Sequence, residues 1–297
     1  MSEVEAIGID IGGTVIKGVS VNAEGEVIEQ VRAESIENIE VLVHRVGRLI
    51  EKLGNGCERV GIASPGLADR RNTCIRWMRG RLAGIEGLDW GNVLRGEVKV
   101  LNDAHAATLA ESWVGAAARY EHVVMLTLGT GVGGGVVSDG KLMQGVNGRA
   151  GHLGHICMDV DGEKDIVGTR GSLEDLVGNH TVKMRTGYES TEALVKAAEG
   201  GEIEAKKYWG WSLEVLACGV VSFINLFDPE VVVIGGGIAK AGEGMLFEPL
   251  RERVQEMEWY VNESGVPIVA AKLGDLAGAV GAARFAMMNE KSSVMRY

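Results

Sequence analysis

The sequence is short of cysteine and of basic residues, and each shortage excludes a class of protein. Its four cysteines, at positions 57, 74, 157 and 218, have no CxxC spacing, and a chain of 297 residues does not need disulfides as staples. We therefore expect reduced thiols. Lysine and arginine total 30 against 41 aspartates and glutamates, which gives a net charge of −11. Because a phosphate backbone attracts positive charge, we expect no nucleic-acid partner.

Signals for export and for a membrane are also missing. The first ten residues carry acidic groups where a signal peptide needs a basic start and an apolar stretch, so we expect a cytoplasmic protein with no membrane partner. The longest apolar stretch, residues 213–227, is interrupted by Glu214, Ser222 and Asn225. It is shorter than the ~20 residues of a membrane span and predicts a buried helix instead.

Glycine is what the sequence has in excess, with 44 residues against 4 prolines and no Gly-X-Y period. Hydrophobic residues make up 46% and charged residues 24%, as in an ordinary globular protein with a large core. We therefore expect the glycines at turns and at close backbone approaches, in loops that can hold a ligand.

Alternating strands and helices predict an α/β architecture. In the first third of the chain, the expected strands are 6–11, 15–21, 59–63 and 98–101. The expected helices are 39–53 and 104–115, and either Asn102 or Asp103 can cap the second one. The segment 69–94 has no clean period and is expected to be irregular.

The N-terminal pattern of a strand, a glycine turn, a second strand and a polar turn occurs again about 115 residues later. Strand 123–128 is followed by a glycine turn over 129–135, a second strand and a polar turn at 138–141. Two such copies predict two lobes of one plan, with a boundary near residues 113–120. The later elements that we expect are a helix over 203–227, a strand over 231–234 and a helix over 276–288.

Three glycine-rich bends, at 10–14, 129–135 and 235–237, could bind a polyphosphate, because glycine leaves backbone N–H groups unobstructed. The alternative is that these glycines only shape turns. Two familiar phosphate motifs do not fit. Gly129-x-Gly131-x-x-Gly134 leads into a strand rather than the helix of a dinucleotide fold, and Leu142 stands where a P-loop needs Ser or Thr.

Two aspartates are expected at the ends of strands. Asp10 ends a buried strand beside a glycine bend, where a carboxylate needs a partner or a hydrated cation, and Mg²⁺ held largely through water is the natural candidate. Asp103 is either a helix cap or a general base that takes a proton from a hydroxyl group attacking phosphorus. The adjacent Asn102 could hold the same substrate.

The combination of Asp10-x-Gly12-Gly13-Thr14, Asn102-Asp103, the 127–135 loop and the run Gly148 to His155 resembles the ROK family of sugar kinases and related repressors, over residues 6 to about 285. This resemblance implies the two-lobed actin-like, hexokinase-like ATPase fold. The implied lobes are 1–113 joined by a C-terminal helix over 276–297, and 114–275. It also implies a homodimer.

The resemblance assigns a role to each motif residue. Asp103 is the base, and the sugar is bound by Gly66, Asn102, Asp103, His152, His155 and Glu174. Mg²⁺ is held by Asp10 through water. The phosphates of ATP contact Asp10, Gly12, Gly13, Thr14, Lys17, Thr130, Gly131, Gly133 and Gly134, and the adenosine contacts Gly235, Gly236 and Gly237.

The sequence departs from the family pattern on the sugar side. His152 stands where family kinases commonly have Glu, and Arg81 where Asn is usual. Family members often hold a structural zinc with three cysteines and a histidine; those three positions are Asp165, Val167 and Ser172. Without thiolates we expect no structural zinc, so His155 is free to bond to the substrate or to Glu174.

The expected activity is transfer of the γ-phosphoryl group of MgATP to a hydroxyl group of a hexose, the 6-hydroxyl of glucose by default. N-acetylmannosamine, N-acetylglucosamine and allose are alternative acceptors. Two other classes remain open: a sugar or nucleotide sensor without catalysis, and an acyl or acetate kinase of the same superfamily. A DNA-binding regulator is not expected, because no helix-turn-helix domain precedes the first strand.

Overall fold

The computed structural model describes residues 3–54, 56–78, 82–259, 264–288 and 294–295. The chain groups into two compact units. The first unit is 1–119, 135–151 and 273–297, and the second unit is 120–134 and 152–272. This grouping by compactness draws different boundaries from the lobes expected above, 1–113 with 276–297 and 114–275, which stay a prediction.

The first unit is built on a five-stranded sheet in the order β3-β2-β1-β4-β7. Strands β1 and β2 form an antiparallel hairpin, β2 pairs antiparallel with β3, and β4 and β7 continue the sheet in parallel. The strands are β1 (Ala6–Ile11), β2 (Val15–Val21), β3 (Val27–Glu34), β4 (Val60–Ser64) and β7 (Val98–Asn102). A two-stranded sheet lies outside it, made of β5 (Leu67–Ala68) and β6 (Ile75–Trp77).

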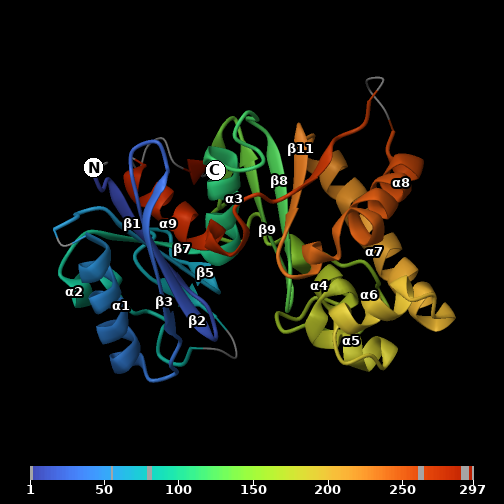
Figure 1. Ribbon diagram of the computed structural model, residues 1–297, viewed down its shortest axis with the longest axis horizontal. Coiled ribbons are helices and arrows are strands. Elements are labelled where there is room, and N and C mark those ends of the chain that lie inside the picture. The colour runs from blue at the N-terminus through green and yellow to red at the C-terminus, as the bar shows by residue number, and fades with distance from the viewer. Residues whose placement is uncertain (1–2, 55, 79–81, 260–263, 289–293, 296–297) are drawn as a thin grey trace. The chain divides into compact units, whose positions relative to one another are not determined.

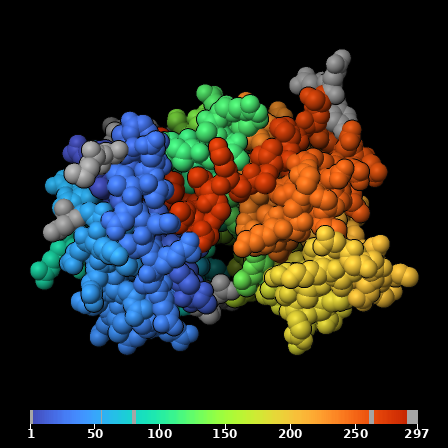
Figure 2. All heavy atoms as spheres, viewed as in Figure 1, coloured from blue at the N-terminus to red at the C-terminus, as the bar shows by residue number. Residues whose placement is uncertain are grey.

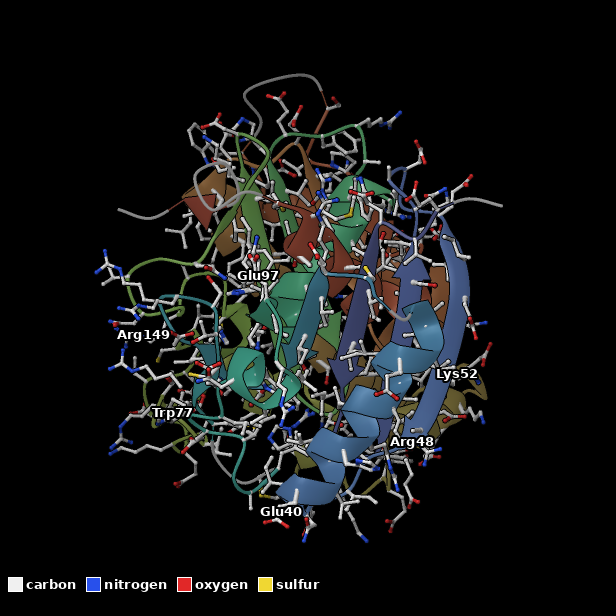
Figure 3. All side chains as sticks on the ribbon, turned by 90° about the vertical axis from the view of Figure 1, so that its left-hand side faces the viewer. Glu40, Arg48, Lys52, Trp77, Glu97 and Arg149 are labelled. Atoms are coloured by element: carbon white, nitrogen blue, oxygen red, sulfur yellow. The ribbon has the colours of Figure 1, made fainter. Side chains whose placement is uncertain are left out.

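Helices cover both faces of this sheet (Figure 1). Helix α1 (Ile39–Gly54) covers one face, where its buried Leu42 and Val46 join a core with Ile7 and Ile9 of β1. Figure 3 looks onto this face, with the charged residues of α1 on its outer side. The other face packs against α9 (Ala277–Met287), which also contacts α3 (Asp103–Trp113).

The second sheet has the order β12-β11-β8-β9-β10-β13. Its strands are β8 (Val123–Leu128), β9 (Val132–Ser138), β10 (Lys141–Met143), β11 (Val231–Gly235), β12 (Ile268–Ala270) and β13 (Val294–Met295). Five of these strands repeat the arrangement of the first sheet, because β10-β9-β8-β11-β12 corresponds in chain order to β3-β2-β1-β4-β7. The repeat seen in the sequence therefore corresponds to two sheets with the same strand order.

The longer helices of the second unit are α4 (Leu173–Val177), α5 (Asn179–Thr186), α6 (Thr191–Glu199), α7 (Ile203–Phe227) and α8 (Glu248–Met257). Among the described residues, α7 is the one helix whose length and hydropathy would suffice to cross a membrane. However, it packs against α4, α6 and α8 and buries Leu213, Leu216 and Phe223 along one side. That is the behaviour of a core helix, as predicted for 213–227.

Three local predictions were wrong. The segment 69–94 is not irregular throughout, since it contains β6 and a short helix α2 (Trp90–Leu94). Strand β3 was missed because most of its side chains are exposed, so its sequence lacks the alternation of apolar and polar residues that indicates a strand. The side chains of β3 form part of the blue surface in Figure 2. The glycine turn expected over 129–135 is shorter, because β9 already begins at Val132.

Helix α9 packs so closely that several of its contacts exclude any side chain. A Cβ atom at Gly8 of β1 would overlap the carbonyl oxygen of Ala279, and one at Gly61 of β4 would overlap that of Ala282. On the side towards α3, a Cβ atom at Gly281 would overlap the backbone of Ala106. Glycine at these positions lets backbone lie against backbone, which explains the small-residue composition of α9.

We expect Gly281→Ala to lower the free energy of unfolding by about 2 kcal/mol or more, because an added methyl group in a filled core forces the helices apart. The matched control is Gly210→Ala in α7, where the nearest atom to an added Cβ is Arg253 Nη2 at 3.9 Å. Helix propensity should make that variant neutral or up to ~1 kcal/mol more stable. Chemical denaturation measures both, and equal effects would contradict this packing.

Candidate functional site

Asp10 lies near the end of β1 on the face that meets α9. Its carboxyl group rests on the first turn of that helix, where a Cβ atom at Gly278 would lie 2.7 Å from Asp10 Oδ2. The N-terminal end of a helix favours negative charge, since its first N–H groups lack helical partners. Gly278 therefore leaves the space in which this carboxyl group sits.

The surroundings of Asp10 disfavour its charged form. Burial, and after it the carboxylates of Asp103 and Asp275, together raise the pKa of Asp10 to about 7, although Lys17 acts in the opposite direction. Lys17 is the cross-strand partner of Asp10 in the β1–β2 hairpin, and its Nζ lies 3.7 Å from Asp275 Oδ2. A cation beside these carboxylates would relieve their repulsion.

Asn102 and Asp103 stand at the junction of β7 and α3. Asn102 is the N-cap of α3, because its Oδ1 accepts the N–H groups of Ala104 (2.9 Å) and His105 (3.1 Å). Its Nδ2 donates to the carbonyl oxygen of Gly66 at 3.0 Å, which brings the predicted sugar residues Gly66 and Asn102 together. The half-buried carboxylate of Asp103 follows in the first turn, where its Oδ1 also accepts the N–H group of Ala104 at 2.8 Å.

A buried histidine ties α3 to the segment that precedes His152. His105 Nε2 lies 2.8 Å from the carbonyl oxygen of Ala150 and, because a carbonyl only accepts, donates to it. Burial lowers the pKa of His105 to about 4, against the opposing effect of that hydrogen bond. The ring is therefore neutral at physiological pH.

In the second unit, the 129–132 loop is linked to the predicted sugar residue Glu174. The N–H group of Val132 donates to Glu174 Oε2 at 2.9 Å. A Cβ atom at Gly131 would overlap the same oxygen, so only glycine lets the carboxylate approach. Thr130 and Gly131 lie in this loop, whereas Gly133 and Gly134 belong to β9.

His152 and His155 are neighbours, with parallel rings whose centroids are 6.4 Å apart. The contact of His155 with the substrate stays a prediction, and the structure adds a partner that was not expected, since His155 Nδ1 lies 2.8 Å from Oδ2 of the buried Asp165. Asp165 Oδ1 accepts the N–H groups of Val167 (3.0 Å) and Thr169 (2.8 Å). Burial raises the pKa of Asp165, but these hydrogen bonds outweigh that effect and lower it overall.

The remaining predicted residues lie at the end of β11 and in the bend between β1 and β2. Gly235 ends β11, and Gly236 has φ +89 and a backbone so close to Leu128 that a Cβ atom would overlap its carbonyl oxygen. A Cβ atom at Gly237 would meet nothing within 4 Å. Gly12, Gly13 and Thr14 form the exposed bend between β1 and β2. Arg81 lies outside the described residues.

By unit, the first holds Asp10, Gly12, Gly13, Thr14, Lys17, Gly66, Asn102 and Asp103, and the second holds Thr130, Gly131, Gly133, Gly134, His152, His155, Glu174, Gly235, Gly236 and Gly237. Sequence reasoning missed His105, Asp165 as a partner of His155, and Asp275. The small segment before α9 gave no signal for Asp275, whose role depends on Lys17 and Arg32 of distant strands.

The pKa values of Asp10 and His105 predict a specific dependence of stability on pH. The folded state binds an extra proton at Asp10 between pH 4 and 7, which lowers stability as pH rises; neutral His105 has the opposite effect between pH 4 and 6.5. Asp10→Asn removes the first effect only. Its stability relative to the wild type should therefore grow with pH by up to about 1.4 kcal/mol per pH unit between pH 4 and 7.

Denaturation curves at several pH values measure this difference. Asp275→Asn is the matched control, because this carboxylate is half exposed and its pKa is lowered, chiefly by Arg32. Its difference from the wild type should not grow over that range. Parallel pH profiles of Asp10→Asn and the wild type would contradict the burial of an Asp10 carboxylate.

Comparison with known proteins identifies the family. The ROK family model matches residues 6–289. A glucokinase from Thermotoga maritima is 36% identical, over 95% of this chain and 97% of the relative, and an N-acetyl-D-glucosamine kinase from Photobacterium profundum is 32% identical, over 93% and 97%. The crystal structure of a ROK family glucokinase from Streptomyces griseus in complex with glucose and AMPPNP has a TM-score of 0.78 at 26% identity, over 94% of this chain and 98% of that one. The duplicated α/β sheets are those of the two-lobed actin-like ATPase fold, and the chain belongs to the ROK family.

Proposed function

We propose that this protein is an ATP-dependent sugar kinase that transfers the γ-phosphoryl group of MgATP to the 6-hydroxyl group of a hexose. The observation that carries the proposal is the placement of Asp103. Asp103 is a half-buried carboxylate that directly follows the parallel strand β7, beside Asn102, and a carboxylate at this place can serve as a base as well as accept the N–H group of Ala104. The full-length match to glucokinases and the Streptomyces structure with glucose and AMPPNP support ATP as the donor.

In this proposal Asp103 is the general base. It accepts the proton of the sugar hydroxyl as that oxygen attacks the γ-phosphorus, a contribution of typically 10²–10⁴-fold. The backbone of 10–14 and of 130–134 would bind the phosphates, with Gly235, Gly236 and Gly237 at the adenosine. Most of the remaining acceleration comes from positioning the two reactants.

The carboxylates beside Asp10 fit a divalent cation. The charged form of Asp10 is disfavoured by burial and, after that, by Asp103 and Asp275, and a cation would relieve the repulsion among these carboxylates. Asp10 would hold Mg²⁺ through water. Bound there, Mg²⁺ would neutralise charge on the phosphate oxygens. Because the proton competes for Asp10, Mg²⁺ should bind more weakly below pH 7.

The sugar would be bound by Asn102 and Gly66 of the first unit and by His152, His155 and Glu174 of the second. With Nδ1 hydrogen-bonded to Asp165, His155 presents Nε2 to a hydroxyl group. Glucose is the default acceptor, and N-acetylglucosamine, N-acetylmannosamine and allose are the alternatives. The similarity to N-acetyl-D-glucosamine kinases supports testing amino sugars beside glucose.

The decisive test is a panel of hexoses and N-acetylhexosamines with MgATP in an assay of ADP release. One strong acceptor is the expected result, and it would also show what His152 recognises in place of the usual Glu. If no sugar is phosphorylated while MgATP still binds, the kinase proposal is wrong and a non-catalytic sensor is the better description.

Asp103→Asn should lower kcat by at least ~10², because the amide cannot accept the proton. The affinity for MgATP and the midpoint of thermal unfolding should change little, since Asn102 provides the cap. Asp161→Asn is the matched control, an exposed aspartate in a surface turn of the second unit, and should keep full activity. Turnover retained by Asp103→Asn would remove this residue from the role of base.

We also propose a cytoplasmic homodimer. Support comes from large apolar side chains exposed on the second unit, namely Trp211 and Leu226 of α7 and Trp259 after α8. Trp259 lies beside α7, since its Nε1 donates to Asn225 Oδ1 at 2.6 Å. Light scattering during size-exclusion chromatography should give twice the mass of one chain, and replacing Trp259 with Glu should shift the protein towards half that mass. A monomer at micromolar concentration contradicts the proposal.

A further inference from the structure

The start of α5 holds the 129–132 loop by its carbonyl groups. The N–H group of Asn179 donates to the oxygen of Gly129 at 3.0 Å, and that of His180 to the oxygen of Thr130 at 2.9 Å. The ring of His180 binds the same oxygen, with Nδ1 at 2.8 Å. Its other nitrogen, Nε2, lies 3.0 Å from Asp175 Oδ1 of α4. Asp175 thus orients the ring that holds Thr130.

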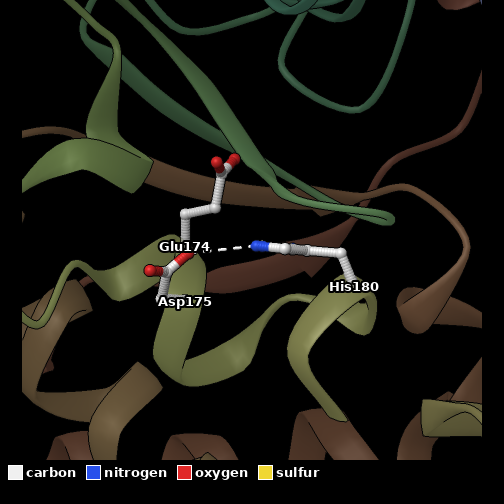
Figure 4. A group of neighbouring side chains, drawn as sticks. All are labelled: Glu174, Asp175 and His180. Atoms are coloured by element: carbon white, nitrogen blue, oxygen red, sulfur yellow. Dashed lines mark hydrogen bonds and ion pairs between the residues drawn. The ribbon is translucent and has the colours of Figure 1, made fainter. Parts of the chain in front are cut away.

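These side chains have the composition of a metal site, but their atoms already have partners. Glu174, Asp175 and His180 offer ligand atoms within 4.8 Å of one another. Figure 4 shows the ring of His180 turned towards Asp175, while the carboxylate of Glu174 points elsewhere. Nδ1 and Nε2 of His180 lie within hydrogen-bond distance of Thr130 O and Asp175 Oδ1, which both accept, so a ring with one proton donates to one of them and a ring with two protons donates to both; Glu174 Oε2 accepts from Val132. A cation would have to break all of these bonds.

The carbonyl contacts determine where the N–H groups of the loop point. In a trans peptide the C=O group of one residue and the N–H group of the next point in opposite directions, and the described chain has no cis peptide bond. Because the oxygens of Gly129 and Thr130 face α5, the N–H groups of Thr130 and Gly131 point away from it. Two successive N–H groups with one orientation suit an anion.

We propose that His180, oriented by Asp175, is a positioning residue that directs the N–H groups of Thr130 and Gly131 towards the phosphates of ATP. The inference rests on the proposed function and adds two residues that the family motifs above do not include. In this proposal the N–H group of Val132 has a different role from those of Thr130 and Gly131. Its N–H group is committed to Glu174, so the residue that binds sugar and the loop that binds phosphate share one hydrogen bond.

The stability of the protein should depend little on this pair. The side chains of His180 and Asp175 are 37% and 23% exposed, and ion pairs at such sites contribute about 0–1 kcal/mol. Substitutions at His180 should therefore leave the protein folded. A change in nucleotide binding can then be assigned to the loop.

Two amide substitutions separate the two bonds of the ring. The side-chain nitrogen of Asn reaches the position of His Nδ1, and that of Gln reaches the position of His Nε2. His180→Asn can therefore still donate to Thr130, while His180→Gln can only reach Asp175. We expect His180→Gln and His180→Ala to raise KM for MgATP about tenfold, the usual effect of one hydrogen bond, and His180→Asn to stay within about threefold of the wild type.

KM for the sugar should be unchanged in all three variants, and His44→Asn, on the exposed side of α1, is the matched control. Equal KM values for MgATP across the three variants would overturn the proposal. So would a loss in His180→Asn as large as that in His180→Ala.

A second measurement keeps this inference separate from the proposed function. Amide hydrogen exchange of the 129–132 segment, followed without nucleotide, should be faster in His180→Ala and His180→Gln than in the wild type and His180→Asn. If the wild type phosphorylates no sugar, the proposed function fails, while exchange still decides whether His180 holds the loop. Unchanged exchange in every variant overturns the role of His180 whatever the activity.

Discussion

The first unit depends on the contact of one C-terminal helix with the backbone of the N-terminal sheet. Gly8, Gly61 and Gly281 allow α9 to approach β1, β4 and α3 without intervening side chains. The approach also brings Gly278 under the carboxyl group of Asp10. Close packing of small residues is therefore what places the first turn of α9 beside the aspartate at the first glycine bend.

The two predicted phosphate-binding segments differ in their surroundings. Around Asp10, burial and neighbouring carboxylates raise the pKa of this residue, so a nearby cation would be favourable. In the second, the oxygens of the 129–132 loop are held from behind by α5 and its N–H groups are left to face a ligand.

Much of the fold could be predicted, and the failures have physical reasons. Strands β1, β2 and β8 and helix α7 have the predicted bounds, because their apolar patterns are strong and their ends are marked by glycine or polar residues. β3 was missed because an exposed edge strand lacks apolar alternation. Gly133 and Gly134 were expected in a turn, since glycine has little propensity for strands. They lie in β9, because pairing with a neighbouring strand outweighs the low strand propensity of glycine.

The candidate site was predictable where it follows local motifs and not where it depends on distant contacts. Asp10 and Asn102 lie at the ends of β1 and β7, and Asp103 follows β7, so the sequence order alone indicates their place. Asp165 could not be assigned to His155, and His180 could not be assigned to Thr130, because the pairs are separated by 10 and 50 residues and each depends on how loops pack. A resemblance to a family predicts the roles of residues that its members share. It does not predict contacts such as these, which depend on residues outside the shared motifs.

The position of α9 has a consequence for synthesis on the ribosome. The face of the N-terminal sheet with Gly8 and Gly61 is completed only by residues 277–287. During synthesis this face of β1 and β4 therefore stays uncovered until residues 277–287 have left the ribosome, more than 200 residues after β4. The sheet can form earlier, but its packing is completed only then.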